Sequence, residues 1–344
     1  MMNTRIEYID EIKGFAIFLV VMGHVVAWQF SDFYVAYEDS RYDNQLILWR
    51  LIYSFHMPLF MFCSGLFIKR FSESSTCKDL FSQIGKRCRT LMLPYISMGL
   101  LLYVIWNRSD FYWFLLILFE FQVVNLSISY IASRCRQHSS LIEISLYLII
   151  YILFTLLGKY GEQFERLPFF DIGHLGLYVY FTLGTLCRKF NYLEKITRSN
   201  NLYTLCLILL SFLWWLKFSY DINIASFPLG RFFKIIEPLS AIIVLFYFFR
   251  NSSLSKYMNT FLQNMGRHSL ELYTLHLLMP LTIPVLGECY LKEIEVMGGV
   301  FLQLVSQLFA TLIVSIIVIG LCYVAIIFIE KSKLLSLLLF GKKG

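Results

Sequence analysis

The first long apolar segment of the chain carries a cation and an imidazole at a spacing that could serve chemistry. Lys13 and His24 lie eleven residues apart, close to three turns of an α-helix, so both project from one face, about 16 Å apart along the axis. This layout suits a long anionic cosubstrate that enters at the charged end and reacts near the imidazole. Taken singly, Lys13 could be an interfacial charge and His24 an interhelical hydrogen-bond partner. Their shared face favours a functional interpretation.

Four further ionisable residues lie in the middle of apolar segments. An ionisable side chain at the bilayer centre costs about 2.5 to 3.5 kcal/mol on insertion scales, so such residues usually mark a functional site. We expect them to line a shared polar interior with His24, although either carboxylate could simply neutralise a buried His or Lys. The four residues are His56, Glu120, Glu237 and His276.

The sequence around two of these histidines adds local detail. Pro58 closely follows His56 and removes a backbone donor, so we expect the helix to kink where His56 lies, which can open a cavity. Ser269 and Tyr273 precede His276 by about two turns and one turn, so the three side chains share one polar stripe. Ser269 is equally well placed to cap the start of that helix.

A basic run lies between the second and third of the apolar segments. It consists of Lys86, Arg87 and Arg89, shortly before Pro94. The tendency of cytoplasmic segments to keep positive charge explains this run without any ligand. The functional alternative is a rim that binds phosphate groups, because arginine offers bidentate contacts to phosphoryl oxygens.

The composition of the chain identifies the kind of fold that must position these residues. Its 344 residues are 58% hydrophobic and only 15% charged, where a soluble domain usually carries about 25% charge. This excludes a water-soluble fold, a disordered chain, a disulfide-stapled secreted module and a nucleic-acid binder. Because a spanning helix needs roughly 20 apolar residues, we expect an all-α polytopic membrane protein of about ten transmembrane helices. The expected spans are 12–30, 46–68, 90–107, 111–132, 140–158, 171–187, 201–218, 231–249, 269–287 and 299–329.

Lys and Arg residues concentrate in alternate connecting segments, which predicts that both termini are cytoplasmic. The first apolar run follows acidic residues and lacks a small-residue cleavage pattern, so we expect it to remain an uncleaved span. Residues 1–344 are expected to form a single transmembrane domain. Of the eight cysteines, only Cys289 falls in a predicted outer loop, so we expect no extracytoplasmic disulfide within one chain.

Five short motifs then follow one another along the chain. They are Asp10 to His24, Phe55 to Gly65, the basic run ending at Pro94, Trp113-Phe114-Leu115, and Gly266 to His276. In this order, over most of a chain of this length, they resemble the acyltransferase 3 family of bacterial integral-membrane acyltransferases, especially its fucose-acetylase-like branch.

The resemblance implies an activity and its partners. Members of the family move an acyl group from cytoplasmic acyl-CoA to a hydroxyl of a carbohydrate, commonly a surface polysaccharide or its lipid-linked precursor. The expected cosubstrate is therefore acyl-CoA, in the first place acetyl-CoA, with no metal and no permanently bound cofactor. The expected location is the bacterial inner membrane, with the lipid bilayer as surroundings and no nucleic-acid partner. We expect no appended extracytoplasmic hydrolase-like domain of the kind that some longer family members carry, so acceptor recognition is expected to come from the bundle and its short outer loops.

One position departs from the family pattern. The charged residue eleven positions before the intramembrane histidine is usually Arg, and here it is Lys13. Lysine keeps the charge but loses the bidentate fork of arginine. Similar Lys versions occur in the fucose-acetylase-like branch, so this chain does not resemble an inactive copy.

Together with the resemblance, these residues lead to the hypothesis of direct acyl transfer inside the membrane. We expect Lys86, Arg87 and Arg89 to hold the CoA nucleotide, with the pantetheine arm running past Lys13, which Asp10 orients. Burial should keep His24 neutral, so that it acts as general base on the acceptor hydroxyl.

Other steps and other functions stay open from the sequence. His56 or Tyr273 could donate to the thioester oxygen as negative charge develops. A covalent acyl-enzyme is less favoured, because no Ser or Cys is demonstrably paired with a base. The alternative function is a proton-coupled transporter or flippase, because buried His and Glu also mark proton paths. Such transporters often contain inverted repeats, and none is visible in this sequence.

Overall fold

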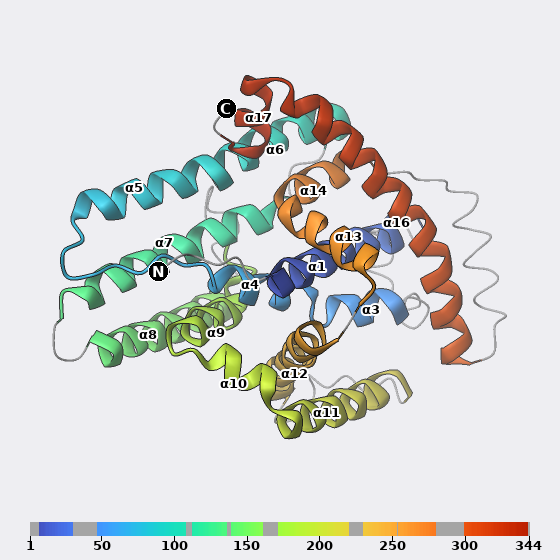
Figure 1. Cartoon of the computed structure of the whole chain (residues 1–344), viewed down its shortest axis with the longest axis horizontal. Helices are drawn as coiled ribbons and strands as arrows, with labels where there is room; N and C mark the ends of the chain where they lie inside the picture. The colour runs from blue at the N-terminus through green and yellow to red at the C-terminus, as the bar shows by residue number, and fades with distance from the viewer. Residues whose placement is uncertain are drawn as a thin grey trace. The chain divides into compact units, whose positions relative to one another are not determined.

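The computed structural model describes residues 7–29, 47–107, 112–135, 139–160, 171–219, 230–252, 254–279 and 299–342. Throughout these ranges every regular element is a helix, as Figure 1 shows. The predicted all-α class is therefore confirmed. Cys289 and the end of the expected span 269–287 lie outside the described residues.

The helices group into two compact units, each assembled from two stretches of chain. The first unit comprises Met1–Phe60 and Leu193–Ile326, and the second comprises Met61–Tyr192 and Ile327–Gly344. The expectation that 1–344 act as one transmembrane domain stays a prediction.

The first unit is organised around its N-terminal helix. Helix α1 contacts α3, α12, α13 and α14, while α11 packs along α12. The residues that α1 carries are therefore covered from several sides. The elements are α1 (Glu7–Gln29), α3 (Ile47–Tyr53), α10 (Tyr192–Arg198), α11 (Asn200–Ser219), α12 (Gly230–Asn251), α13 (Lys256–Arg267), α14 (Ser269–Leu275), the 3₁₀ turn η5 (His276–Leu278) and most of α16 (Val300–Glu330).

The second unit is organised around α7, which contacts α5, α8 and α9. Helix α5 continues through a π-helical turn into α6, and the C-terminal helix α17 packs on α6. The elements are the second half of α4 (His56–Gly65), α5 (Cys77–Arg87), the π-helix η1 (Cys88–Met92), α6 (Leu93–Trp106), α7 (Trp113–Ser133), α8 (Ser139–Tyr160), the 3₁₀ turn η3 (Leu175–Leu177), α9 (Tyr178–Lys189) and α17 (Lys333–Phe340).

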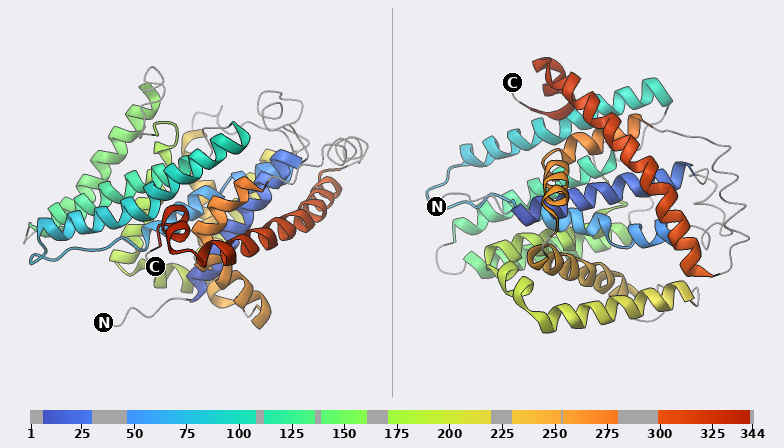
Figure 2. Two further views of the ribbon diagram at one scale, coloured as in Figure 1. Left: turned by 90° about the horizontal axis from the view of Figure 1, so that it is seen from above. Right: turned by 45° about the vertical axis from the view of Figure 1, so that its right-hand side comes forward.

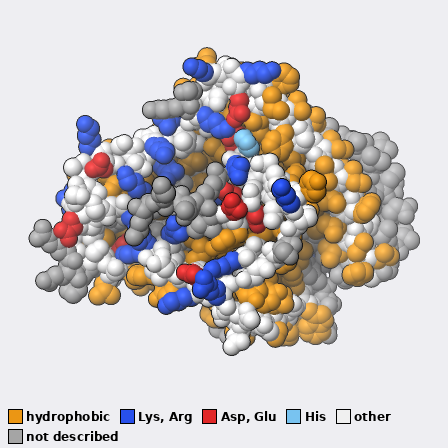
Figure 3. Space-filling view, in the orientation of Figure 1, with side chains coloured by type: hydrophobic (Ala, Val, Ile, Leu, Met, Phe, Trp, Pro, Cys, Tyr) orange, Lys and Arg blue, Asp and Glu red, His pale blue; other side chains and the backbone are white. Residues whose placement is uncertain are grey.

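Five helices in the described residues are long and apolar enough to cross a membrane, or six if a pair bent by 75° forms one span. Hydrophobic side chains line the exposed surface of one of them, α16, as Figure 3 shows, which suits contact with lipid. The chain is thus a multi-pass membrane protein, while the count of ten spans and the orientation of the termini stay predictions. The five are Cys77–Ile105, Trp113–Ser133, Ser139–Tyr160, Phe232–Asn251 and Leu304–Glu330, and the bent pair is Tyr192–Arg198 with Asn200–Leu216.

Several expected spans are not simple membrane-crossing helices. The span 171–187 contains the 3₁₀ turn η3, and the described part of 269–287 contains the 3₁₀ turn η5. Helix α1 begins at Glu7, ahead of the expected span 12–30, and carries Asp10, Glu11 and Lys13 in its N-terminal half. The expected span 46–68 is interrupted by a turn at Ser54 and Phe55, between α3 and α4.

Helices α1 and α13 are in contact, as Figure 2 shows. Where the two helices cross, their backbones approach each other closely. A Cβ atom added to Gly14 would lie 1.9 Å from the Leu262 carbonyl oxygen. A Cβ atom added to Gly266 would lie 2.0 Å from the Asp10 carbonyl oxygen. Only glycine fits at these two points, and the close approach fixes the turn of α1 that carries Lys13.

We expect Gly266→Leu to destabilise the protein, because the new side chain would collide with the backbone of α1. Overpacking of a tight contact typically costs about 1 to 3 kcal/mol, and a backbone oxygen cannot rotate away as a side chain can. The measurement is the midpoint of thermal aggregation of the detergent-purified protein. Gly99→Leu is the matched control, because a Cβ at Gly99 in α6 would meet nothing within 4 Å. Equal midpoints for the two variants would contradict the close packing of α1 and α13.

Candidate active site

The structure brings two of the expected histidines into direct contact. His24 Nδ1, from the middle of α1, lies 2.7 Å from His276 Nε2 at the start of η5. The two ring centroids lie 4.9 Å apart and the ring planes are inclined at 18°. His276 is buried and His24 is half-buried. A hydrogen bond therefore joins two imidazoles that are 252 residues apart in the chain.

The surrounding hydrogen bonds assign the proton positions on this pair. His276 Nδ1 lies 2.9 Å from the Leu272 carbonyl oxygen, which can only accept, so Nδ1 of His276 carries the proton. In the neutral ring Nε2 of His276 is then the acceptor, and Nδ1 of His24 must donate to it. The basic nitrogen of His24 is consequently Nε2, since a neutral imidazole carries one N–H.

His56 belongs to the same unit and has the same tautomer. Its Nδ1 lies 2.8 Å from the Ile52 carbonyl oxygen, so Nδ1 donates and Nε2 is the acceptor in the neutral ring. The Tyr53 ring lies 4.6 Å from the His56 ring, and it packs so closely on α1 that a Cβ at Gly23 would lie 2.8 Å from Tyr53 Cε2.

His24 contacts His276 directly, and His56 lies against the Tyr53 ring that packs on α1 at Gly23. We call His24, His56 and His276 the imidazole cluster. The kink predicted beside His56 is present as the turn at Ser54 and Phe55, directly before His56. Pro58 lies in the first turn of α4, where a missing N–H leaves no hydrogen bond unmade.

Lys13 and His24 lie on one unbroken helix, as the spacing predicts. Lys13 is half-buried, while its neighbours Asp10 and Glu11 are buried. Glu11 Oε1 accepts a hydrogen bond of 2.9 Å from Gln263 Nε2 on α13. This contact, together with the glycine crossing, fixes the N-terminal part of α1 against α13. The role of Asp10 in orienting Lys13 stays a prediction.

Other candidate residues of the first unit are also buried. Glu237 on α12 accepts a hydrogen bond of 3.1 Å from Trp214 Nε1. Tyr273 lies with its ring centroid 5.8 Å from that of His276. Ser269 is the first residue of α14, and the cap position is taken by His268. The alternative that Ser269 caps this helix is therefore wrong, because the turn begins one residue earlier.

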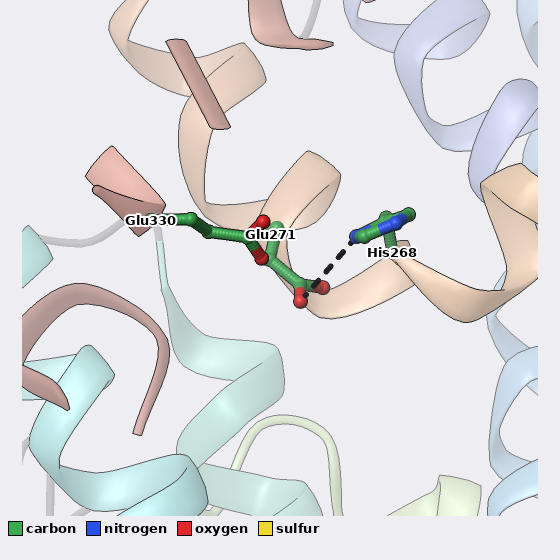
Figure 4. A group of neighbouring side chains, drawn as sticks. All are labelled: His268, Glu271 and Glu330. Carbon is green, nitrogen blue, oxygen red and sulfur yellow. Dashed lines mark ion pairs between the residues drawn. The ribbon is translucent and has the colours of Figure 1, made fainter. Parts of the chain in front are cut away.

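A neighbouring pair of side chains at this turn was not among the candidates predicted from the sequence. His268 Nδ1 lies 3.7 Å from Glu271 Oε1, as Figure 4 shows, and Glu271 is buried. A carboxylate inside an apolar segment was the signal that could have singled out Glu271, as it did Glu120 and Glu237.

The second unit holds the remaining candidates. Glu120, on α7, accepts a hydrogen bond of 3.0 Å at Oε1 from the Asp171 backbone N–H. Lys86 and Arg87 end α5, and Arg89 lies in the π-helix that follows. Lys and Arg side chains gather on the face of the molecule drawn in Figure 3.

The π-helix is fixed by the C-terminal segment of the same unit. Arg89 Nε donates a hydrogen bond of 3.3 Å to the Gly341 carbonyl oxygen. Ser97 Oγ donates to the Leu338 carbonyl oxygen at 2.6 Å. Gly341 has a φ of +64°, and a Cβ there would lie 2.4 Å from the Arg89 carbonyl oxygen. π-helical turns are rare and often occur at functional sites, and this one sets the direction of the basic run.

These features define a multi-pass helical membrane protein with a buried imidazole cluster and a separate basic run. An acyltransferase domain matches residues 6–327, nearly the whole chain, and the chain therefore belongs to the acyltransferase 3 family. Its class is that of a membrane acyltransferase. The family predicted from the five motifs is confirmed.

One curated relative shares a shorter segment. The chain is 34% identical over 95 residues to the nodulation protein NolL of Mesorhizobium japonicum. The match spans 27% of this chain and 23% of NolL, so it covers less than a quarter of that relative. No solved structure matches the chain.

Proposed function

We propose that this acyltransferase moves an acyl group, acetyl in the first place, from acyl-CoA to a hydroxyl group of a carbohydrate. The acceptor is a surface polysaccharide or its lipid-linked precursor, and the setting is the bacterial inner membrane. The observation that carries the proposal is the His24 to His276 hydrogen bond of 2.7 Å. It supports the assignment of His24 Nε2 as the base that general base catalysis requires.

The proposed reaction is a single direct transfer. His24 Nε2 accepts the proton of the acceptor hydroxyl while that oxygen attacks the thioester carbonyl carbon. The carbon to sulfur bond then breaks, and the imidazolium of His24 returns its proton to the CoA thiolate. The products are the O-acyl carbohydrate and free CoA, and His24 ends as it began.

Stabilisation of the thioester oxygen falls more naturally to Tyr273 than to His56. Because Nδ1 of His56 donates to Ile52, its Nε2 can donate only if the ring is doubly protonated. The Tyr273 hydroxyl donates in its neutral form, and Tyr273 is buried beside His276. We assign His56 instead to accepting a hydrogen bond from the substrate, and Glu237 and Ser269 to support of the cluster.

On the donor side we assign Lys13, Lys86, Arg87 and Arg89 to the anionic groups of acyl-CoA. Guanidinium groups match phosphoryl oxygens bidentately, whereas Lys13 supplies a point charge. Asp10 orients Lys13 in this proposal, and its burial one turn before Lys13 supports that role.

Gly341→Val is expected to raise the KM for acetyl-CoA by about tenfold, the effect of losing one charge-assisted hydrogen bond. A Cβ at this position would push the C-terminal segment off the π-helix and displace Arg89. The measurement is steady-state kinetics with varied acetyl-CoA. Gly320→Val on α16 is the control, because a Cβ at Gly320 would meet nothing within 4 Å. An unchanged KM for Gly341→Val would contradict the positioning of the basic run by the C-terminus.

The test of the function follows free CoA and the glycan together. The full-length protein in nanodiscs is given acetyl-CoA, either alone or together with a glycan extract from cells that lack this protein. The release of free CoA is recorded through its thiol group. We expect CoA release only with the extract, and an acetyl mass increment on one glycan. Transport of solute by the protein in sealed vesicles, without consumption of acetyl-CoA, would instead favour the transporter alternative.

A further inference from the structure

A second cluster of polar and aromatic side chains lies in the second unit, where α7 begins and where the segment leading into α9 starts. It consists of Trp113, Glu120, Asp171 and His174, which we call the Trp113 cluster. The Trp113 indole stacks on the His174 imidazole with centroids 3.6 Å apart and planes at 11°. The two rings form one face-to-face stack, which we call the aromatic platform, and a further ring could stack only on one of its two outer faces.

Hydrogen bonds fix the orientation of this platform. Asp171 accepts from His174 Nδ1 at 2.9 Å through Oδ2 and from the His174 backbone N–H at 3.2 Å through Oδ1. The Asp171 backbone N–H in turn donates to Glu120 Oε1 at 3.0 Å. The imidazole, both carboxylates and the platform are thus held as one connected group.

Two features of the cluster are not explained by packing alone. The His174 side chain is 41% exposed although its ring is stacked on Trp113 and hydrogen-bonded to Asp171, so the platform can be reached from that side. The second oxygen of Glu120, Oε2, is buried with no hydrogen-bond partner among the described residues. A buried carboxylate oxygen without a donor is costly, and such a residue in a membrane helix usually serves a function.

We propose that the Trp113 cluster is a subsite for a neutral carbohydrate, and that it binds the acceptor of the proposed reaction. The stacked rings would contact the apolar face of a pyranose. The Asp171 carboxylate accepts hydrogen bonds from its hydroxyl groups, and Glu120 Oε2 offers a second polar contact. This inference rests on the proposed function for the identity of the acceptor, but not for the binding of the sugar.

The charges of the cluster favour a neutral ligand. The Asp171 carboxylate repels phosphates and uronic acids, whereas the basic run of the same unit attracts them. The acyl donor and the carbohydrate acceptor are accordingly assigned to residues of opposite charge. This difference limits the binding of either substrate at the site of the other.

The binding test does not depend on catalysis. The full-length protein in nanodiscs is mixed with methyl pyranosides of gluco, galacto and 6-deoxygalacto configuration, and saturation-transfer NMR records which sugar protons contact the protein. Methyl glucuronoside serves as the anionic probe. The variants are Trp113→Ala, His174→Gln and Glu120→Gln, and Trp215→Ala on α11, half exposed at 51%, is the matched control.

We expect at least one neutral glycoside to give saturation transfer with the wild type and with Trp215→Ala. With Trp113→Ala the affinity should fall about fivefold, the loss expected for one aromatic contact. Methyl glucuronoside should give the weakest signal. No transfer from any neutral glycoside, or equal transfer to the wild type and all three cluster variants, would overturn the subsite.

Acceptor kinetics separate this inference from the proposed function. In the CoA-release assay, Trp113→Ala and His174→Gln should raise the KM for the glycan extract and leave the KM for acetyl-CoA unchanged, which also shows that the variants are folded. An unchanged KM for the extract would count against the subsite alone. Absence of CoA release by the wild type would count against the proposed function, while the NMR result would still decide the subsite.

Discussion

His24→Asn is expected to slow acyl transfer strongly while leaving the protein folded. The amide nitrogen of Asn lies close to the position of Nδ1, so the variant can still donate to His276 Nε2, but it has no counterpart of the basic Nε2. General base catalysis contributes about 10²- to 10⁴-fold, and we expect a loss in that range. The measurement is the rate of acceptor-dependent CoA release by the purified protein in nanodiscs.

Two controls make this expectation specific to the base. The KM for acetyl-CoA should stay unchanged in His24→Asn, because Lys13 and the basic run are untouched. The thermal midpoint should stay close to that of the wild type, because the hydrogen bond to His276 is kept. A His24→Asn variant that transfers acyl groups at the wild-type rate would show that His24 is not the base.

The placement of Lys13 and His24 on one face could be predicted from the sequence, because it depends only on helical periodicity. The membrane class also follows from composition, since few charges and long apolar runs cannot form a water-soluble core. The sequence predicts a break in the second expected span near Pro58, because proline lacks a backbone donor. In the structure the break lies a few residues earlier, at Ser54 and Phe55. These are properties of short segments, for which sequence is sufficient.

The pairing of His24 with His276 could not be predicted, because it joins residues 252 positions apart. It depends on how α1 meets α14 and η5, and that packing is set by glycine contacts at Gly14 and Gly266 whose partners are backbone atoms. Tautomers are also invisible in a sequence, because they follow from the carbonyl oxygens that each Nδ1 meets. The stacking of Trp113 on His174 has the same cause, since it arises between distant segments.

Loss of His276 is expected to reduce turnover without weakening the binding of acetyl-CoA. In His276→Leu the acceptor for the His24 Nδ1 proton disappears, so the ring can rotate or adopt the other tautomer, in which Nε2 carries the proton and cannot act as base. An unsatisfied buried partner costs about 1 to 3 kcal/mol, which corresponds to a fall in kcat of about tenfold to a hundredfold. Steady-state kinetics with varied acetyl-CoA measure both parameters.

A conservative variant distinguishes positioning from mere structural support. The side-chain oxygen of Gln in His276→Gln lies near the place of Nε2 and can accept the same proton from His24, so most of the turnover lost in His276→Leu should return. A residue that only filled space would be replaced better by Leu than by Gln, since Leu suits an apolar interior. Equal turnover for the two variants would therefore contradict the role of His276 in fixing the tautomer of His24, even if both variants were folded and bound acetyl-CoA normally.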